Sequence, residues 1–173
     1  RGGSVSRAEP GPPAYRLEVE VRRERAGPGG HCTRDRAAFA LPELERLPQS
    51  AVAAAINCKK RAGGEGSMLW GGASLRSVLH RAGVTESEAE AGEASSSQVE
   101  IFGEDQGSRA GRPPVRLSMH RAVQGDVLLA LRVDGEPLSA EKGAPVRLLV
   151  PGSASQSVKW LRRIVVTTEA SKS

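Results

Sequence analysis

The chain has 173 residues, of which 38% are hydrophobic and 26% charged, so it is long enough for one domain with a buried core. Aromatic residues make up only 3%, which predicts a core of Leu, Val, Ile and Ala and argues against a sheet of exposed rings that stacks on single-stranded nucleic acid. The formal net charge of +5 permits an anionic partner such as RNA, and no apolar run reaches the ~18 residues that a membrane-spanning helix needs.

The N-terminal region divides at Tyr15. Residues 1–14 combine Gly, Pro, Ser and charged residues with almost nothing to bury, which predicts a flexible or partner-bound arm. From Tyr15 to Val21 apolar residues alternate with charged ones, as in a half-buried strand. The Gly and Pro residues of 25–30 end that strand. The domain is therefore predicted to occupy residues 15–173.

The middle of the chain predicts two short helices with a strand between them. Leucines three residues apart in 39–47, with Pro42 in the first turn, predict a short helix. The apolar run 51–56 is short, which favours a strand, although its periodicity alone does not separate a strand from a buried helix. Ser74 as N-cap and Gly83 as C-cap bound the second helix.

The second half of the chain predicts a series of short strands. The acidic, polar segment 84–97 is predicted to be a loop or a frayed helix end. Strands are expected, separated by segments rich in turn residues such as 103–114 and Asp134-Gly135, at 98–102, 127–133, 146–150 and 164–168. Many short strands and a few short helices, without a regular βαβ rhythm, predict an α+β or mainly β fold.

Two cysteines, Cys32 and Cys58, are too few for a disulfide framework, and their spacing matches no zinc or redox motif. A reducing compartment is therefore expected. The chain begins at Arg1 in place of Met, and an Arg-rich start fits a protein imported into an organelle, although trimming during expression leaves the same start. We expect a mitochondrial location, with the cytoplasm as the alternative.

Five blocks of the chain occur in the order in which one enzyme family places them. The longest is DVLLALRVDGEPLSAEKGAPVRLLVPGSASQSVKWLRRIVV, residues 126–166. Upstream of it are the strand that begins at Tyr15 and the blocks FALPELERLPQ, AAINCKKR and SLRSVLHRAGV. Together these blocks resemble the molybdopterin-binding domain of the sulfite oxidase family of oxidoreductases. The resemblance implies an α+β fold of mixed sheets with short helices, shortened relative to the family.

The resemblance also implies candidate site residues. In that family a cysteine thiolate binds molybdenum together with the sulfurs of a pterin, and Cys58 occupies its position; a thiolate is a soft, anionic ligand suited to such a metal. A small buried residue at a strand end is the alternative role for Cys58. Lys159 is the candidate for a pterin or phosphate contact, or else a surface charge on a packed turn. Arg61 is the candidate for the anion-binding pocket of the cofactor site.

Around Cys58 the chain departs from the family pattern. Long cationic residues, KKR at 59–61, replace a turn that contains Gly and Asn, and the active-site loop that follows is shorter than in the family. Gln98 stands where the family has a histidine, and Pro113 and Arg116 stand where it has a tyrosine and a serine. Because catalysis needs a preorganised pocket, these departures predict a domain that has kept the scaffold and lost most of its site.

The sequence therefore favours a non-catalytic accessory or structural subunit of a larger, mitochondrial assembly, without a bound cofactor and with no catalytic residue. Its expected partners are other protein subunits, with RNA as a further partner of the basic surface. The arm 1–14 and the acidic segment 84–97 are the expected docking elements. The alternative is an oxidoreductase that depends on the molybdenum cofactor and uses Cys58 as the metal ligand.

Overall fold

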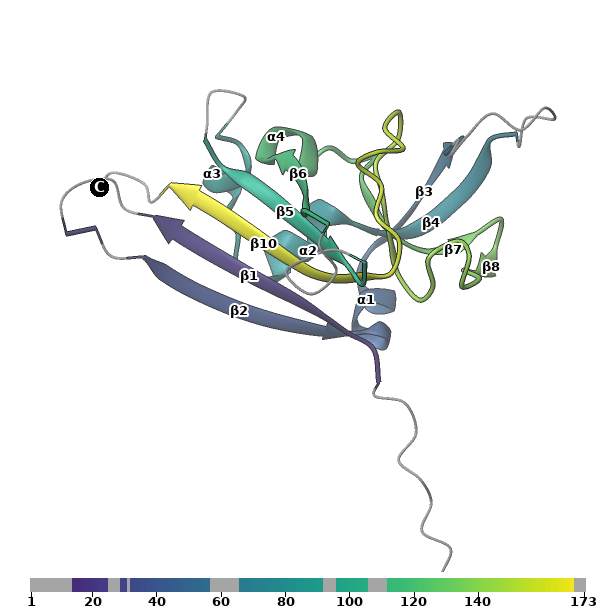
Figure 1. Ribbon diagram of the computed structural model, residues 1–173, viewed down its shortest axis with the longest axis horizontal. Coiled ribbons are helices and arrows are strands. Elements are labelled where there is room, and N and C mark those ends of the chain that lie inside the picture. Colours follow the sequence, from purple (N-terminus) through teal and green to yellow (C-terminus); the bar gives the residue numbers. More distant parts are fainter. Residues whose placement is uncertain are drawn as a thin grey trace, which may run out of the picture.

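The chain folds into one mixed sheet and one antiparallel sheet, with short helices at their sides. The computed structural model describes residues 14–24, 29–30, 32–56, 66–91, 96–105 and 112–169. Within these ranges, sheet A has the order β2-β1-β10-β5-β6, and sheet B has the order β3-β4-β7-β8, with β9 also paired to β7. In Figure 1 sheet A runs across the front of the molecule, and β3, β4, β7 and β8 gather at one end.

The bounds of the elements follow the chain. Sheet A consists of β1 (Arg16–Glu24), β2 (Thr33–Ala40), β5 (Gln98–Gly103), β6 (Val115–Ser118) and β10 (Leu161–Glu169). Sheet B consists of β3 (Gln49–Ala54), β4 (Met68–Ser74), β7 (Leu128–Val133), β8 (Glu136–Pro137) and β9 (Arg147–Leu149). The helices are α1 (Leu41–Arg46), α2 (Leu75–Arg81), α3 (Glu86–Ala89) and α4 (Met119–Ala122).

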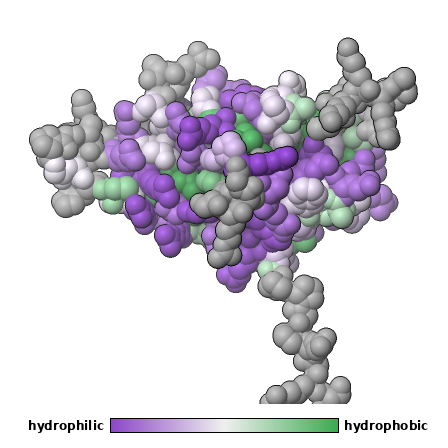
Figure 2. All heavy atoms as spheres, in the orientation of Figure 1, coloured by the Kyte–Doolittle hydropathy of each residue, from purple (hydrophilic) through white to green (hydrophobic). Residues whose placement is uncertain are grey.

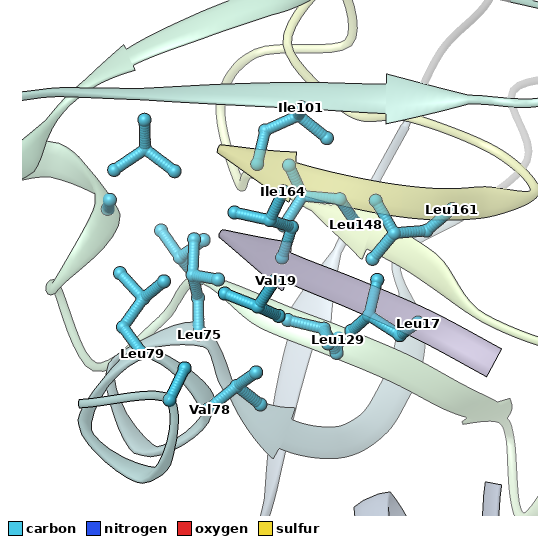
Figure 3. Close-up of a cluster of buried hydrophobic side chains, with 14 of the residues drawn as sticks. Leu17, Val19, Leu75, Val78, Leu79, Ile101, Leu129, Leu148, Leu161 and Ile164 are labelled. Carbon is cyan, nitrogen blue, oxygen red and sulfur yellow. The ribbon is translucent and has the colours of Figure 1, made fainter. Parts of the chain in front are cut away.

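The main core lies behind sheet A and is aliphatic, as the composition predicts. Inward side chains of β1, β5 and β10 meet side chains of α2 and β7 in one buried cluster, which Figure 3 shows in close-up. Leu17 and Val19 of β1 and Leu75 and Leu79 of α2 are at most 1% exposed. A second, smaller cluster surrounds Trp70 in sheet B. Burial of this apolar surface is the main source of stability for both layers.

Most of the predicted elements are confirmed, with shifted ends. The strand from Tyr15 is β1, the leucine-spaced helix is α1, and the run 51–56 is a strand whose bounds are Gln49–Ala54. Helix α2 begins as predicted, because the Ser74 side chain accepts a hydrogen bond from the Ser77 N–H at 3.1 Å. The predicted C-cap Gly83 instead follows the capping residue, with φ at +106°.

The strands β2, β4 and β6 and the helix α4 were not predicted, and α3 forms in a segment expected to be a loop or a frayed helix end. Strand β2 is an edge strand whose outward residues are mostly charged, so it lacks the apolar signal of a strand. Strand β4 contains two glycines. A side chain on Gly72 would overlap the backbone oxygen of Leu129, so this glycine is needed for the close approach of β4 to β7.

Several predictions from the sequence concern residues that the structure does not describe. The arm 1–14 lies outside the described residues except at Ala14, and residues 92–95 of the acidic segment and 106–111 of the predicted loop also lie outside them. None of the helices in the described part of the chain is long and apolar enough to cross a bilayer.

Tyr15 is the single tyrosine of the chain, and its hydroxyl ties β1 to β10. The phenol donates a hydrogen bond to the carbonyl oxygen of Leu161 at 2.7 Å, and the residue is partly buried against the main core. Burial raises the pKa of this phenol well above its ordinary value, and the positive charge of Arg162 opposes that rise only in part. The folded state therefore binds the phenolic proton more tightly than the unfolded state does.

The pKa of Tyr15 is higher in the folded state than in the unfolded state. The stabilisation that the protonated phenol provides is therefore complete below about pH 10 and is lost as the pH rises above that value. We expect the free energy of unfolding of the wild-type chain to fall more steeply above pH 10 than that of Tyr15→Phe, by up to about 1.4 kcal/mol per pH unit. Urea unfolding at a series of alkaline pH values measures both slopes. Equal slopes for the two proteins would contradict this assignment.

Candidate functional site

Lys159 lies in the turn that joins β9 to β10, and its position is set by close packing on Gly143. A Cβ atom on Gly143 would lie 2.9 Å from Cβ and 3.0 Å from Cα and Cγ of Lys159. Gly143 also has φ at +103°, a conformation that other residues adopt at a cost. Glycine at this position therefore allows the backbone to lie directly against the stem of the lysine.

Trp160 fastens the same turn to residues 139–147, which we call the junction segment. Its N–H donates to the carbonyl oxygen of Gly143 at 3.2 Å, and its indole N–H donates to the carbonyl oxygen of Ala140 at 2.9 Å. The ammonium group of Lys159 lies 5.7 Å from the centroid of the Trp160 ring. Trp160 itself has φ at +52°, which is unusual for an aromatic residue and is held by these contacts.

The other end of the junction segment packs on the β3–β4 hairpin near its connecting loop. Arg147 is only 6% exposed, and its guanidinium carbon lies 5.1 Å from the centroid of the Trp70 ring. One of its Nη atoms donates to the carbonyl oxygen of Lys142 at 3.3 Å. The Nζ of Lys142 lies 3.5 Å from Sδ of Met68, the first residue of β4. Lys142, Arg147 and the neighbouring Lys159 thus place positive charges between strand β4 and the turn before β10.

Cys58 and Arg61 lie outside the described residues, in the connection between β3 and β4. The two ends of this connection are described. Ile56 at its start and Met68 after its end both pack on the second core cluster, as does Ala144 of the junction segment. The fold therefore starts and ends the Cys58-bearing connection beside the segment that holds Lys159.

The cations beside the Cys58-bearing connection suit a phosphate-bearing group. Within the described ranges, no group of three or more His, Cys, Asp or Glu side chains could hold a metal ion. The cations of Lys142, Arg147 and Lys159 are gathered on one segment and its neighbour, where charge-assisted hydrogen bonds to phosphate oxygens are strong. Sequence reasoning named Lys159 and missed Lys142 and Arg147.

Two of the family departures lie away from Lys159. Gly103, the last residue of β5, approaches Lys159 so closely that a Cβ there would lie 2.5 Å from the lysine carbonyl oxygen. Gln98 is the first residue of the same strand, ~17 Å further along it at 3.4 Å per residue, and pairs with Thr167 and Ser118. Arg116 forms an ion pair with Glu100 at 3.0 Å on the outer side of sheet A. Pro113 lies just before β6.

Comparison with known proteins identifies a family that matches most of the chain. The family described as "Oxidoreductase molybdopterin binding domain" matches residues 8–173. The sulfite oxidase of Gallus gallus is 34% identical over 94% of this chain, and the mitochondrial sulfite oxidase of Drosophila melanogaster is 31% identical over 94%. A nitrate reductase of Phaseolus vulgaris is 35% identical over 74% of this chain.

The chain corresponds to part of each of these proteins. It spans 37% of the length of the chicken protein, 29% of the fly protein and 14% of the bean protein. Among solved structures, the sulfane dehydrogenase SoxCD of Paracoccus pantotrophus superposes with a TM-score of 0.64 over 92% of this chain, at 24% identity and over 39% of its own chain. This last likeness is one of fold.

The packing of Gly143 on Lys159 can be tested against a glycine that shares its backbone conformation but not its neighbours. Gly152 has φ at +79°, and a Cβ atom added there would meet nothing within 4 Å. Both Gly143→Ala and Gly152→Ala carry the cost of a positive φ, and Gly143→Ala should lose a further 1–3 kcal/mol, roughly, from overpacking. Urea unfolding measures the two losses. Equal destabilisation would show that the contact with Lys159 does not constrain position 143.

Proposed function

This chain belongs to the oxidoreductase molybdopterin-binding domain family, and from that membership we propose that it binds a molybdopterin-type molybdenum cofactor and serves an oxidoreductase. The family membership confirms the resemblance found in the sequence. The proposal rests on the contacts of the junction segment. At one end Gly143 packs on Lys159. At the other end Lys142 and Arg147 contact Met68 and Trp70 of β4, the strand that follows the Cys58-bearing connection.

Each candidate residue has a role in this proposal. Cys58 provides the thiolate ligand of the metal, and Lys159 contacts the pterin or its phosphate. Arg61 belongs to the pocket that attracts an anion. When bound, the cofactor supplies a metal centre for oxygen-atom and electron transfer.

The chain's own contribution is to hold positive charge in place before a ligand arrives. The Arg147 guanidinium stacks on Trp70, and the indole N–H of Trp70 donates to the carbonyl oxygen of Ala54 at 3.1 Å, at the end of the strand that leads to Cys58. Charge that is fixed by packing requires little reorganisation when an anion binds. The names of the relatives, sulfite oxidase and nitrate reductase, support a small oxyanion as the substrate class.

The compartment is part of the same proposal. The name of the fly relative includes the word mitochondrial, which supports a mitochondrial location.

The metal-ligand assignment is tested with the two cysteines of the chain. Cys58→Ser should remove most of the molybdenum from protein purified from cells that make the cofactor, because an alcohol does not replace a soft thiolate ligand. Cys32→Ser is the matched control, since Cys32 is exposed and lies just before β2 of sheet A. Metal analysis and pterin fluorescence measure loading. A wild-type protein without molybdenum, or equal loading of both variants, would overturn the proposal.

A second function, that of a non-catalytic accessory subunit, is favoured by the outer face of sheet A. We define this face by the outward residues of its strands, which are Arg16, Glu18, Glu20, Arg22 and Glu24 of β1, Arg34, Arg36, Ala38 and Ala40 of β2, Arg163, Val165, Thr167 and Glu169 of β10, Gln98, Glu100 and Phe102 of β5, and Arg116 and Ser118 of β6. Six arginines thus lie among five glutamates on this face. In Figure 1 no described helix crosses in front of β1 and β2, and Figure 2 shows mostly hydrophilic residues there.

Glu20 forms ion pairs with three of these arginines. It is 4% exposed and accepts hydrogen bonds from Arg22 at 2.6 Å and Arg163 at 2.8 Å, with Arg36 at 3.7 Å. The hydrogen bond from Arg22 is the main cause that lowers the pKa of the Glu20 carboxyl group. One buried carboxylate therefore holds three guanidinium groups on this face, and the excess positive charge of this cluster suits an acidic partner subunit. Phe102 lies under Arg163, so this face presents no free ring for stacking on RNA.

The accessory function predicts that the chain, tagged in its native cells, sediments as part of a larger particle. Arg34→Glu reverses an exposed charge on this face and should release the chain from that particle, because it repels an acidic surface. Arg132→Glu, an exposed arginine of sheet B, is the control for the same change in net charge. Sedimentation that does not change with Arg34→Glu would contradict this function, and sedimentation lost on nuclease treatment would indicate RNA.

A further inference from the structure

One row of side chains across the outer face of sheet A can donate hydrogen bonds and contains no carboxylate. The strand registers place Arg34 of β2 opposite Arg22 of β1, and Arg22 beside Thr167 of β10. The same row continues through Gln98 of β5 to Ser118 of β6. Figure 1 shows β2, β1 and β10 side by side. We call these five residues the donor row.

Arg22 and Arg34 form a like-charge pair within the donor row. Residues directly opposite each other on antiparallel strands have Cβ atoms ~4.5–5.5 Å apart, and two like charges at such positions destabilise the pairing. On the inner face of the same two strands the charges are opposite, because Arg23 donates to the Asp35 carboxylate at 2.5 Å. The outward arginine pair therefore has an electrostatic cost that these strands avoid on their other face.

The neighbouring carboxylates compensate for this cost only in part. Glu20 accepts a hydrogen bond from a single nitrogen of Arg22, Nε at 2.6 Å, and it also pairs with two other arginines. Glu24 is the diagonal neighbour of Arg34 on this face, but within the described part of the chain Arg34 forms no ion pair. The pair of guanidinium groups thus has N–H donors that face solvent.

We propose that Arg22 and Arg34 form a binding site for a phosphate group, with the Thr167 hydroxyl as a further donor. A phosphate dianion between the two guanidinium groups replaces their repulsion with two attractions. Its tetrahedral set of oxygens accepts the paired N–H donors of both side chains, which suits arginine better than lysine. The ligand is a phosphate group, either free or as the monoester of a small molecule.

This site is separate from the candidate cofactor site. Thr167 lies six residues beyond Leu161 along β10, which is ~20 Å of strand, and Lys159 precedes Leu161. The inference therefore goes beyond the proposed function, since it needs neither the cofactor nor a partner subunit. An acidic partner would bring carboxylates to the same arginines, and the experiment below separates the two ligands.

Isothermal titration calorimetry of the purified chain with inorganic phosphate, at constant ionic strength, tests the proposal. Arg34→Gln should raise the Kd for phosphate at least about tenfold, because it removes a charge-assisted donor. Arg132→Gln, at an exposed arginine of sheet B, is the matched control and should leave the Kd unchanged. Lys159→Gln should also leave it unchanged, which distinguishes this site from phosphate bound at the candidate cofactor site.

Urea unfolding provides a second measurement. In buffer of low ionic strength without phosphate, Arg34→Gln should unfold at a higher urea concentration than the wild type, because one of two like charges is gone. Added phosphate should raise the midpoint of the wild type more than that of Arg34→Gln, since a ligand stabilises only the state that binds it. Circular dichroism confirms that each variant is folded.

Three results would overturn the proposal. The first is a wild-type chain that binds no phosphate. The second is phosphate binding that persists in Arg34→Gln and is lost in Lys159→Gln. The third is equal affinity for acetate, which would assign the arginine pair to the carboxylates of an acidic protein. Titration with glycerol phosphate identifies the source of the group, because tighter binding than that of inorganic phosphate indicates a monoester and weaker binding indicates the free anion.

Discussion

The close packing of Gly143 on Lys159 is the contact on which the candidate site depends. It allows the backbone of the junction segment to lie against the turn that begins β10, and backbone hydrogen bonds then hold the two together. Leu161 donates to the carbonyl oxygen of Val146 at 2.9 Å directly beyond this contact. Strand β10 belongs to sheet A, and β9 belongs to sheet B. Gly143 therefore allows a close contact between the two layers, and this contact holds Lys159 near the ends of the Cys58-bearing connection.

The two most buried charged side chains of the described chain, Arg147 and Glu20, lie in the two regions proposed to bind a cofactor and a partner. Burying a charge is costly unless other groups compensate for the water it loses. Arg147 is held over Trp70 beside the candidate cofactor site, and Glu20 is held among arginines on the open side of sheet A. The first arrangement favours binding of an anionic cofactor. The second favours contact with an acidic protein, and one chain can serve both purposes.

The sequence predicts the elements whose signals are local and misses those that depend on distant neighbours. The alternation from Tyr15 and the cap at Ser74 are visible in a few consecutive residues, and both are confirmed. Strand β4 depends on a glycine that fits against Leu129, more than fifty residues away, so local patterns do not reveal it. For the same reason Lys159 could be identified from its sequence motif, whereas the role of Arg147 became visible only from its stacking on the distant Trp70. The assignments of Cys58 and Arg61 stay predictions, because both residues lie outside the described ranges.

We propose that this domain binds molybdenum through Cys58, beside the junction segment. X-ray absorption spectroscopy at the molybdenum edge tests it most directly, because it counts the sulfur atoms bound to the metal. We expect one sulfur neighbour fewer in residual metal-loaded Cys58→Ser than in the wild-type protein, with no change in Cys32→Ser. The same sulfur count in the wild-type protein and Cys58→Ser would contradict the claim.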